Sequence, residues 1–282
     1  MTVGYGYSTL AWIPEAQGSW AVPLLHERIT SWDSPISQAV PQLSKVSSHL
    51  PSRALSLWDS EYGCAPLVNQ TAELPIDKLM RLRSNLCLSG PLPAYRGRGR
   101  PKVHGARFKL NDPTTWSSPA QPVEVDDPDF GQLRLRVWDN LHFRLSPCYP
   151  MSILLVERLT DDGLTRVSQP MWLAFVGLKM PPVPEVWRLY LPRFALNHWY
   201  RFAKNPLHWT VPVLSTPAQG DRWSDLMPIV TLAIMVGPSA CGTTPSAVAE
   251  ISSQAHPWTG SSIFWEHFSS LRYTCSTAQT PR

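Results

Sequence analysis

The stretch VWRLYLPRFALNHWYRFAKNPLHW, from Val186 to Trp209, decides the fold and the function class of this chain. Its pattern predicts one helix over 186–205, which Pro192 opens at a first-turn position and Asn205-Pro206 closes. With about 100° of rotation per residue, one narrow stripe collects three cations around one amide, while apolar side chains cover most of the remaining surface. A cationic stripe on such a helix indicates that it faces an anion. The stripe consists of Arg193, Asn197, Arg201 and Lys204, and Tyr190 points the same way one turn earlier.

Composition sets the broad class of the protein. The 282 residues, 43% of them hydrophobic, are enough for one large domain or two smaller ones, and the net charge of +4 is modest. Any nucleic-acid partner must therefore be inferred from local charge. Five scattered cysteines without a C-x-x-C pair fit a reducing cytoplasm and speak against a structural zinc site. No segment has the pattern of a secretory signal or is long enough to span a bilayer, so we expect a cytoplasmic protein without a membrane partner.

The order of patterns along the chain predicts an α/β fold in four parts. Residues 1–89 form the first part of a core, and residues 90–182 form a β-rich insertion with a basic loop. Helical patterning returns over 183–236, and residues 237–282 are expected to be a flexible tail. In detail, we expect a hairpin over 3–13 and 19–25, a helix within 34–50, strands over 54–58, 79–88, 152–158 and 171–176, and a helix over 223–236.

The acidic positions have two interpretations each. Asp59 follows a buried type of strand, where ligands and metals usually lie in α/β sheets, but it can also simply cap the turn DSEYG. Position alone does not separate these roles. The acids of VEVDDPDFG, residues 123–131, lie between two alternating strands and indicate a hairpin turn more simply than a metal site. The histidines show no ligand spacing with acids or cysteines, so we expect them to be structural or on the surface.

A basic segment points more directly to a partner. Between Asp77 and Asp112 the chain carries nine cations and no acid, and YRGRGRPKVHG, residues 95–105, alternates arginine with glycine. Such a flexible loop can follow a phosphate backbone through contacts that weaken as the salt concentration rises. A solvated surface loop is the alternative. The cations that we expect to contact DNA are Arg96, Arg98, Arg100 and Lys102.

Four stretches together resemble the DDE insertion-sequence transposases of the Y-R-E-K signature group. They are LWDSEYG, RGRGRPKVHGARFKLNDPTTW, RFALNHWYRFAKN and LHWTVPVLSTPAQGDRW, and they follow the expected order between Gly4 and Val236. Tyr190, Arg193, position 197 and Lys204 have the spacing of the signature itself. The resemblance implies a ribonuclease-H-like α/β core, interrupted by a β-rich insertion before the last catalytic helix.

The same resemblance implies the chemistry of a bacterial transposase, a phosphoryl displacement on DNA assisted by two Mg²⁺ ions. In that group two aspartates and a glutamate hold the metal, because hard Mg²⁺ prefers carboxylate oxygens. Asp59 takes the place of the second aspartate, as catalytic residue and metal ligand, and Asn197 stands where the glutamate belongs. Arg193 and Lys204 would bind phosphates near the cut. The partners implied are transposon-end DNA and a second copy in a homodimer.

Two departures from the signature predict that the chain is catalytically inactive. In the family the first aspartate lies on a strand before the opening hairpin, which here begins at Gly4, so we expect that strand to be missing. Asn197 cannot neutralise a cation or accept a proton as a carboxylate does. Three interpretations stay open: a truncated and decayed transposase, a non-enzymatic DNA-binding remnant that interferes with an intact relative, and an open reading frame that never folds stably.

Overall fold

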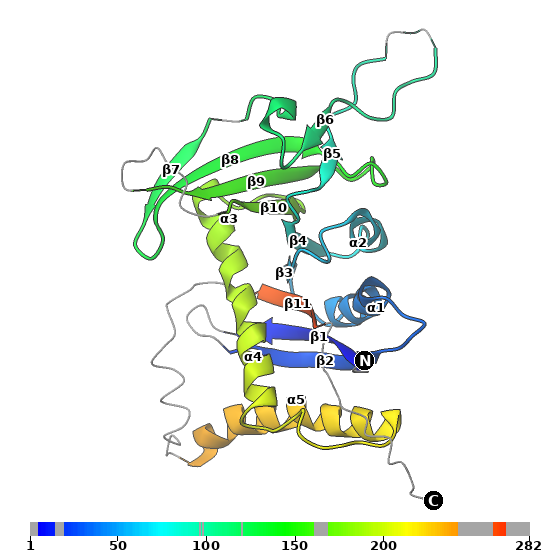
Figure 1. Cartoon of the computed structure of the whole chain (residues 1–282), viewed down its shortest axis with the longest axis vertical. Helices are drawn as coiled ribbons and strands as arrows, with labels where there is room; N and C mark the ends of the chain where they lie inside the picture. The colour runs from blue at the N-terminus through cyan, green and yellow to red at the C-terminus, as the bar shows by residue number, and fades with distance from the viewer. Residues whose placement is uncertain are drawn as a thin grey trace, which may run out of the picture. The chain divides into compact units, whose positions relative to one another are not determined.

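The computed structural model describes residues 5–14, 20–95, 97, 99–119, 121–160, 169–241 and 262–268, with only the backbone for 236–241 and 262–268. They form a mixed α/β protein in two units, Met1–Val46 with Pro192–Arg282 and Ser47–Leu191. Figure 1 shows the elements of each unit along the chain. None of the described helices is both long and apolar enough to cross a membrane.

The first unit has an antiparallel sheet in which β1 pairs with β2 on one edge and with β11 on the other. Side chains alternate across a strand, so successive residues of β1 face different helices. Ser8 donates a hydrogen bond to Gln42 of α1 at 2.9 Å, and the Thr9 hydroxyl lies 2.6 Å from the Tyr200 hydroxyl of α4. Helices therefore cover both faces of β1. The elements are β1 (Gly6–Ile13), β2 (Val22–Ile29), α1 (Pro35–Ser47), α4 (Phe194–Lys204), α5 (Pro217–Cys241) and β11 (Ser262–Phe268).

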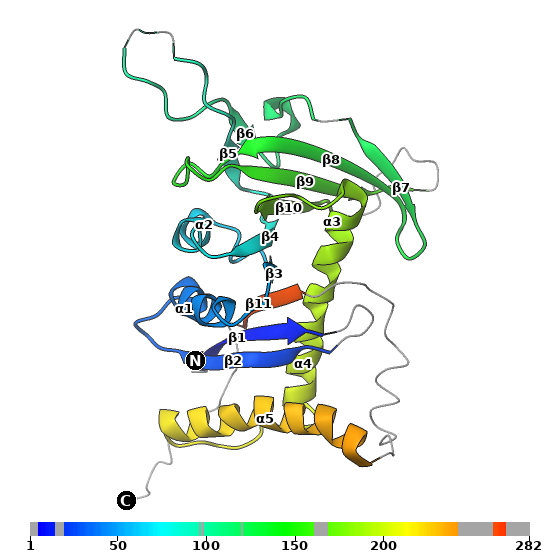
Figure 2. The same ribbon diagram turned by 180° about the vertical axis from the view of Figure 1, so that it is seen from behind.

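Helix α5 packs beside β2, as Figure 2 shows from behind. An ion pair between Arg28 and Asp221, 2.7 Å long, joins the two elements. The predicted tail therefore contains two regular elements, the last turn of α5 up to Cys241 and the strand β11. Gly237-Pro238 suggested an end to the helix, but a proline removes one backbone hydrogen bond and need not stop a long helix. The strand SIFWEHF was hidden because its residues, which favour strands, lie within a segment rich in Ser, Thr and Pro.

The second unit contains strands in the order β3-β4-β10-β9-β8-β7. β3 and β4 are parallel, and every later pair is antiparallel. A separate two-stranded ribbon, β5-β6, carries the basic loop between its strands. The elements are β3 (Ala54–Trp58), α2 (Ala65–Gln70), β4 (Ile76–Leu82), β5 (Cys87–Ser89), β6 (Arg107–Lys109), β7 (Val123–Asp127), β8 (Gly131–Leu141), β9 (Met151–Arg158), β10 (Met171–Val176) and α3 (Val183–Tyr190).

The strand predicted over 54–58 is confirmed as β3, and the predicted hairpin after residue 122 is confirmed as β7-β8. The boundary expected near residue 90 does not coincide with the division between the units. β4, from the expected core, pairs along five residues with β10, from the expected insertion. Local composition changes at residue 90, but backbone pairing joins the segments on either side into one sheet.

The single helix predicted over 186–205 is wrong in its bounds and in the role of Pro192. Helix α3 begins earlier, at Val183, and a 3-10 turn, Leu191–Arg193, separates it from α4. The Leu191 N–H bonds to the Arg188 carbonyl three residues back, in the tighter 3-10 pattern. Pro192 has no N–H to donate. It therefore interrupts the helical hydrogen-bond pattern and does not begin a helix.

Candidate functional site

Asp59 lies directly after β3 and shapes the turn that follows. One carboxylate oxygen accepts a hydrogen bond from the Glu61 N–H at 2.8 Å, and the Asp59 carbonyl accepts one from the Tyr62 N–H at 3.3 Å. The preceding Trp58 is fully buried, which fixes the place where the strand ends. Asp59 therefore has the structural role of stabilising the turn after β3. Its role as a metal ligand stays a prediction.

The basic loop has a narrow, fixed neck. Gly90 and Ala106 face each other across it through a 2.7 Å hydrogen bond from the Gly90 N–H to the Ala106 carbonyl. Gly105 is required there, because an added Cβ would lie 2.1 Å from the carbonyl oxygen of Pro91. Nε2 of His142, the residue directly after β8, lies 3.1 Å from Nδ1 of His104, which ties the end of the loop to the end of β8.

The cations of the loop project from this neck. Arg100 and Lys102 are exposed, and neither forms an ion pair with any residue that the structure describes. Arg96 and Arg98 lie outside the described residues. At the root of the loop, Gly90, Arg107, Phe108 and Trp116 line a hollow. Arg136 stacks over the partly exposed Trp116, its guanidinium 5.1 Å from the ring centre. Cations next to an aromatic face are typical of surfaces that bind nucleic acid.

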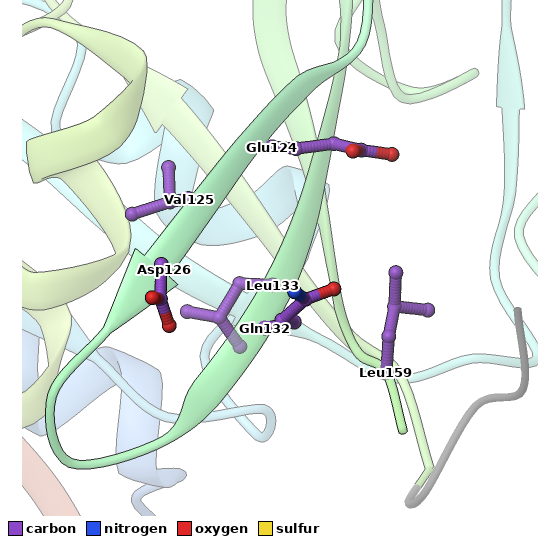
Figure 3. Close-up of a pocket in the computed structure, with 6 residues that line it drawn as sticks. All are labelled: Glu124, Val125, Asp126, Gln132, Leu133 and Leu159. Atoms are coloured by element: carbon purple, nitrogen blue, oxygen red, sulfur yellow. The ribbon is translucent and has the colours of Figure 1, made fainter. Parts of the chain in front are cut away.

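The acids of the β7-β8 hairpin are mainly structural. One oxygen of the buried Asp127 accepts hydrogen bonds from the N–H groups of Asp129 and Phe130, and the other accepts one from Arg188 of α3. Glu124 pairs with Arg134 on the surface at 3.2 Å. The hairpin-turn interpretation is therefore confirmed. Figure 3 shows the shallow hollow beside this turn, lined by Glu124, Val125 and Asp126 of β7, Gln132 and Leu133 of β8, and Leu159.

Comparison with protein families decides the class of the chain. Residues 4–136 match the family described as DDE superfamily endonuclease. This match covers just under half of the chain and supports a DDE transposase-like family. The matched residues run from the opening hairpin into β8, so they include Asp59 and the basic loop, whereas Asn197 lies beyond them. The comparison with curated proteins found no match.

The signature residues, which lie beyond the matched segment, differ strongly in their exposure. Tyr190 at the end of α3 is 1% exposed, and Arg193 is 6% exposed, its guanidinium 4.8 Å above the ring centre of Phe194. Arg201 is open to solvent. Asn197 and Lys204 are half-buried along α4. Tyr190 and Asp59 belong to the second unit, whereas Arg193 and the signature positions after it belong to the first. The phosphate-binding role of each residue therefore stays a separate prediction.

DDE superfamily nucleases typically use divalent metals, so the acidic positions can be tested for such a site. Within the described ranges, no three His, Cys, Asp or Glu side chains lie close enough to hold a metal ion. Asp59 keeps its negative charge while one of its oxygens accepts the Glu61 N–H. The amide of Asn197 carries no negative charge. Asp59 and Asn197 belong to different units, so the two-metal site that the family resemblance implies stays a prediction.

The sequence did not reveal the polar cluster that fastens α4 to the hairpin. The Thr9 hydroxyl lies 2.8 Å from Nδ1 of His26, as well as 2.6 Å from the Tyr200 hydroxyl. The His26 ring stacks on Tyr7 and meets the Trp209 ring edge-on. Burial in this aromatic surrounding lowers the pKa of His26 to about 3, so the ring is neutral at physiological pH. No local spacing signals this cluster, since its members come from three separate segments.

The histidine pair at the loop neck was also missed. His104 and His142 are 38 residues apart in the sequence, and no motif connects them. His142 is 2% exposed, and burial, followed by the neighbouring His104, lowers its pKa. The pair lies next to the strand bridge between Ser89 and His142. The alternation of β8 buries odd-numbered positions such as Leu133, Leu135 and Val137, so it gives no signal for the burial of His142.

Proposed function

We propose that this chain is a transposase-type protein of a bacterial insertion sequence that binds DNA in the cytoplasm but does not cut it. The observation that carries the proposal is the basic loop within the family-matched segment. Its neck is held by backbone hydrogen bonds and a histidine pair, and its exposed cations Arg100 and Lys102 have no acidic partner among the described residues. Such a loop can contact phosphates on either side of a duplex groove without reading the sequence.

The order of elements supports a ribonuclease-H-like core for this function. An antiparallel hairpin and a helix precede β3, which is followed directly by Asp59 and runs parallel to β4. A β-rich stretch then precedes α3 and α4. This stretch lies where the resemblance implies an insertion. The homodimer that the resemblance implies stays a prediction.

DNA binding can be measured by the fluorescence anisotropy of a labelled duplex across a range of salt concentrations. Replacing Arg100 and Lys102 with alanine should weaken binding to all sequences and reduce the slope of log K against log salt by about 2, since each lost phosphate contact releases about one counterion fewer. The matched control replaces the exposed Lys45 and Lys179, which lie outside the loop. An equal loss in both double variants would show that only net charge matters and that the loop is not the interface.

The absence of cutting is proposed because Asn197 stands where the resemblance implies a glutamate, and an amide oxygen carries no negative charge. The test incubates the purified chain with supercoiled plasmid and Mg²⁺ or Mn²⁺ and measures nicking. We expect none above a buffer control, and we expect Asn197→Glu alone to restore none, since only Asp59 and the new glutamate would then be present. Metal-dependent nicking that disappears in Asp59→Ala would overturn this part of the proposal.

The non-enzymatic DNA-binding remnant is thus the favoured form of the transposase interpretation. The remaining alternative, a chain that does not fold stably, predicts no cooperative unfolding. Urea denaturation followed by tryptophan fluorescence separates the two, because a folded protein with buried Trp58, Trp172 and Trp199 should show one or two cooperative transitions.

A further inference from the structure

The hollow at the root of the basic loop has the size and lining of a small-molecule site. Its volume is about 340 Å³, and all of its lining belongs to the second unit. Ligand pockets in proteins have volumes of this order and are mostly apolar, with a few polar groups that orient the ligand. The lining comes from the ribbon β5-β6, the segment between β6 and β7 and the end of β8, and it includes Arg107, Phe108, Trp116, Ser117 and Leu141.

The apolar part of this lining is already fixed in place. Phe108 and Leu141 are each 2% exposed. The Trp116 ring is held because its Nε1 donates a 2.7 Å hydrogen bond to the Lys109 carbonyl, and because it meets the Trp172 ring edge-on at 5.2 Å. A ligand would therefore contact side chains that need no reordering. Aromatic rings in such a lining favour another aromatic ring, through offset or edge-on contacts.

Most polar groups of the lining are already bonded within the protein. The Thr115 hydroxyl donates to the Asp112 carbonyl at 2.7 Å, and the Gly90 N–H donates to the Ala106 carbonyl, also at 2.7 Å. Trp116 Nε1 is bonded as described above. These groups are therefore not available to a ligand.

Two side chains of the lining remain available. Arg107 and Ser117 are exposed, and neither side chain forms a hydrogen bond or an ion pair within the part of the chain that the structure describes. Among the described residues that line the hollow, Arg107 alone carries a charge. A single free guanidinium beside an apolar wall complements a ligand that has one anionic group and an apolar body.

From this lining we infer that the hollow binds a small aromatic carboxylate, whose ring contacts Phe108, Trp116 and Leu141 and whose carboxylate is bound by Arg107. A nucleobase matches the lining less well. The hydrogen-bonding groups on its edge would lose water and meet polar groups that are already bonded. A plain aromatic ring has no such groups to satisfy. The inference goes beyond the proposed DNA binding and does not depend on it.

Fluorine NMR tests the inference on the full chain. The protein is labelled with 5-fluorotryptophan, and the ¹⁹F resonance of Trp116 is identified as the one that Trp116→Phe lacks. The probe is 2-naphthoate, a flat aromatic carboxylate. We expect the Trp116 resonance to move on titration with a Kd of about 0.1–1 mM, the affinity that efficient contacts give a ligand of this size.

Two comparisons show whether the carboxylate is recognised. Arg107→Gln should weaken the binding of 2-naphthoate about fivefold, whereas Lys179→Gln, at an exposed cation that does not line the hollow, should leave the Kd unchanged. The neutral analogue 2-naphthalenemethanol has the same ring system. It should bind the parent chain about fivefold more weakly than 2-naphthoate does, and Arg107→Gln should bind the two compounds equally.

Two results would overturn the inference. One is a Trp116 resonance that does not move with 2-naphthoate up to about 10 mM. The other is equal binding of the acid and the alcohol by the parent chain. Thymidine 5′-monophosphate is titrated in the same way, and tighter binding than that of 2-naphthoate would assign the hollow to a nucleotide instead. None of these titrations contains DNA, so their outcome is separate from that of the DNA-binding proposal.

Discussion

The buried His26 makes the stability of this protein depend on pH in a way that can be worked out. The folded chain holds the ring neutral, with a pKa of about 3 against an ordinary value of 6.5. Below pH 6.5 the unfolded chain binds a proton that the folded chain does not bind, so acid favours unfolding. The stability that the protein has while the His26 ring is neutral in both states is fully present above pH 6.5 and is lost as the pH falls toward 3. Each pH unit in this window costs about 1.4 kcal/mol, which gives about 2.5 kcal/mol between pH 7 and pH 4.5.

Replacing His26 with phenylalanine should remove this dependence. The aromatic ring keeps its stacking partner Tyr7, while the hydrogen bond with Thr9 is lost, so we expect the free energy of unfolding to fall by about 1 kcal/mol at pH 7. At pH 4.5 the free energy of unfolding of the variant should equal or exceed that of the parent chain, because phenylalanine takes up no proton in the unfolded state.

Urea denaturation at pH 7, 6, 5 and 4.5 measures both effects, with the free energy of unfolding taken from each transition. The control is His49→Gln, since His49 is exposed and its Nδ1 lies 3.0 Å from the hydroxyl of the neighbouring Ser48. The control should follow the parent chain at every pH. If the phenylalanine variant also keeps the slope of the parent chain, the protein does not hold His26 neutral and the reasoning fails.

Three further predictions concern the second unit. Asp127→Asn should lower the free energy of unfolding by about 2–4 kcal/mol, because it leaves the Arg188 guanidinium without its buried carboxylate. The control Glu124→Gln, at an exposed pair, should change the free energy of unfolding by less than about 0.5 kcal/mol in the same urea assay. Gly105→Ala should distort the loop neck and weaken DNA binding several-fold by anisotropy, while Gly90→Ala, whose nearest atom would be 3.4 Å away, should bind nearly as the parent chain does. Lys78 is buried, and desolvation lowers its pKa to about 8 from 10.5. Lys78→Met should therefore raise the free energy of unfolding at pH 7 by on the order of 1–3 kcal/mol, and this gain should shrink as the pH approaches 10.5. No gain at pH 7 would contradict the prediction.

Local patterns predicted the elements of this protein well where their causes are local. A short apolar run of the buried type marked β3, and alternation marked the β7-β8 hairpin, because a half-buried strand has a period of two. Charge and glycine content marked the basic loop for the same kind of reason. The helix around Pro192 was predicted with wrong bounds, because residues before Val186 have weak helical patterning and the proline could be either a start or a break.

The amino-acid sequence by itself determined the family, the position of Asp59 after a buried strand, the cationic loop and the amide at position 197. Each of these is a property of residue type and short spacing. Only the tertiary structure decided which distant segments meet: Thr9 with Tyr200, His104 with His142, and β11 with β1. These contacts join residues separated by 38 to 261 positions, and backbone pairing or burial selects them without any periodic signal in the sequence. The strand that completes the β1 edge therefore came from the segment whose composition had predicted a flexible tail.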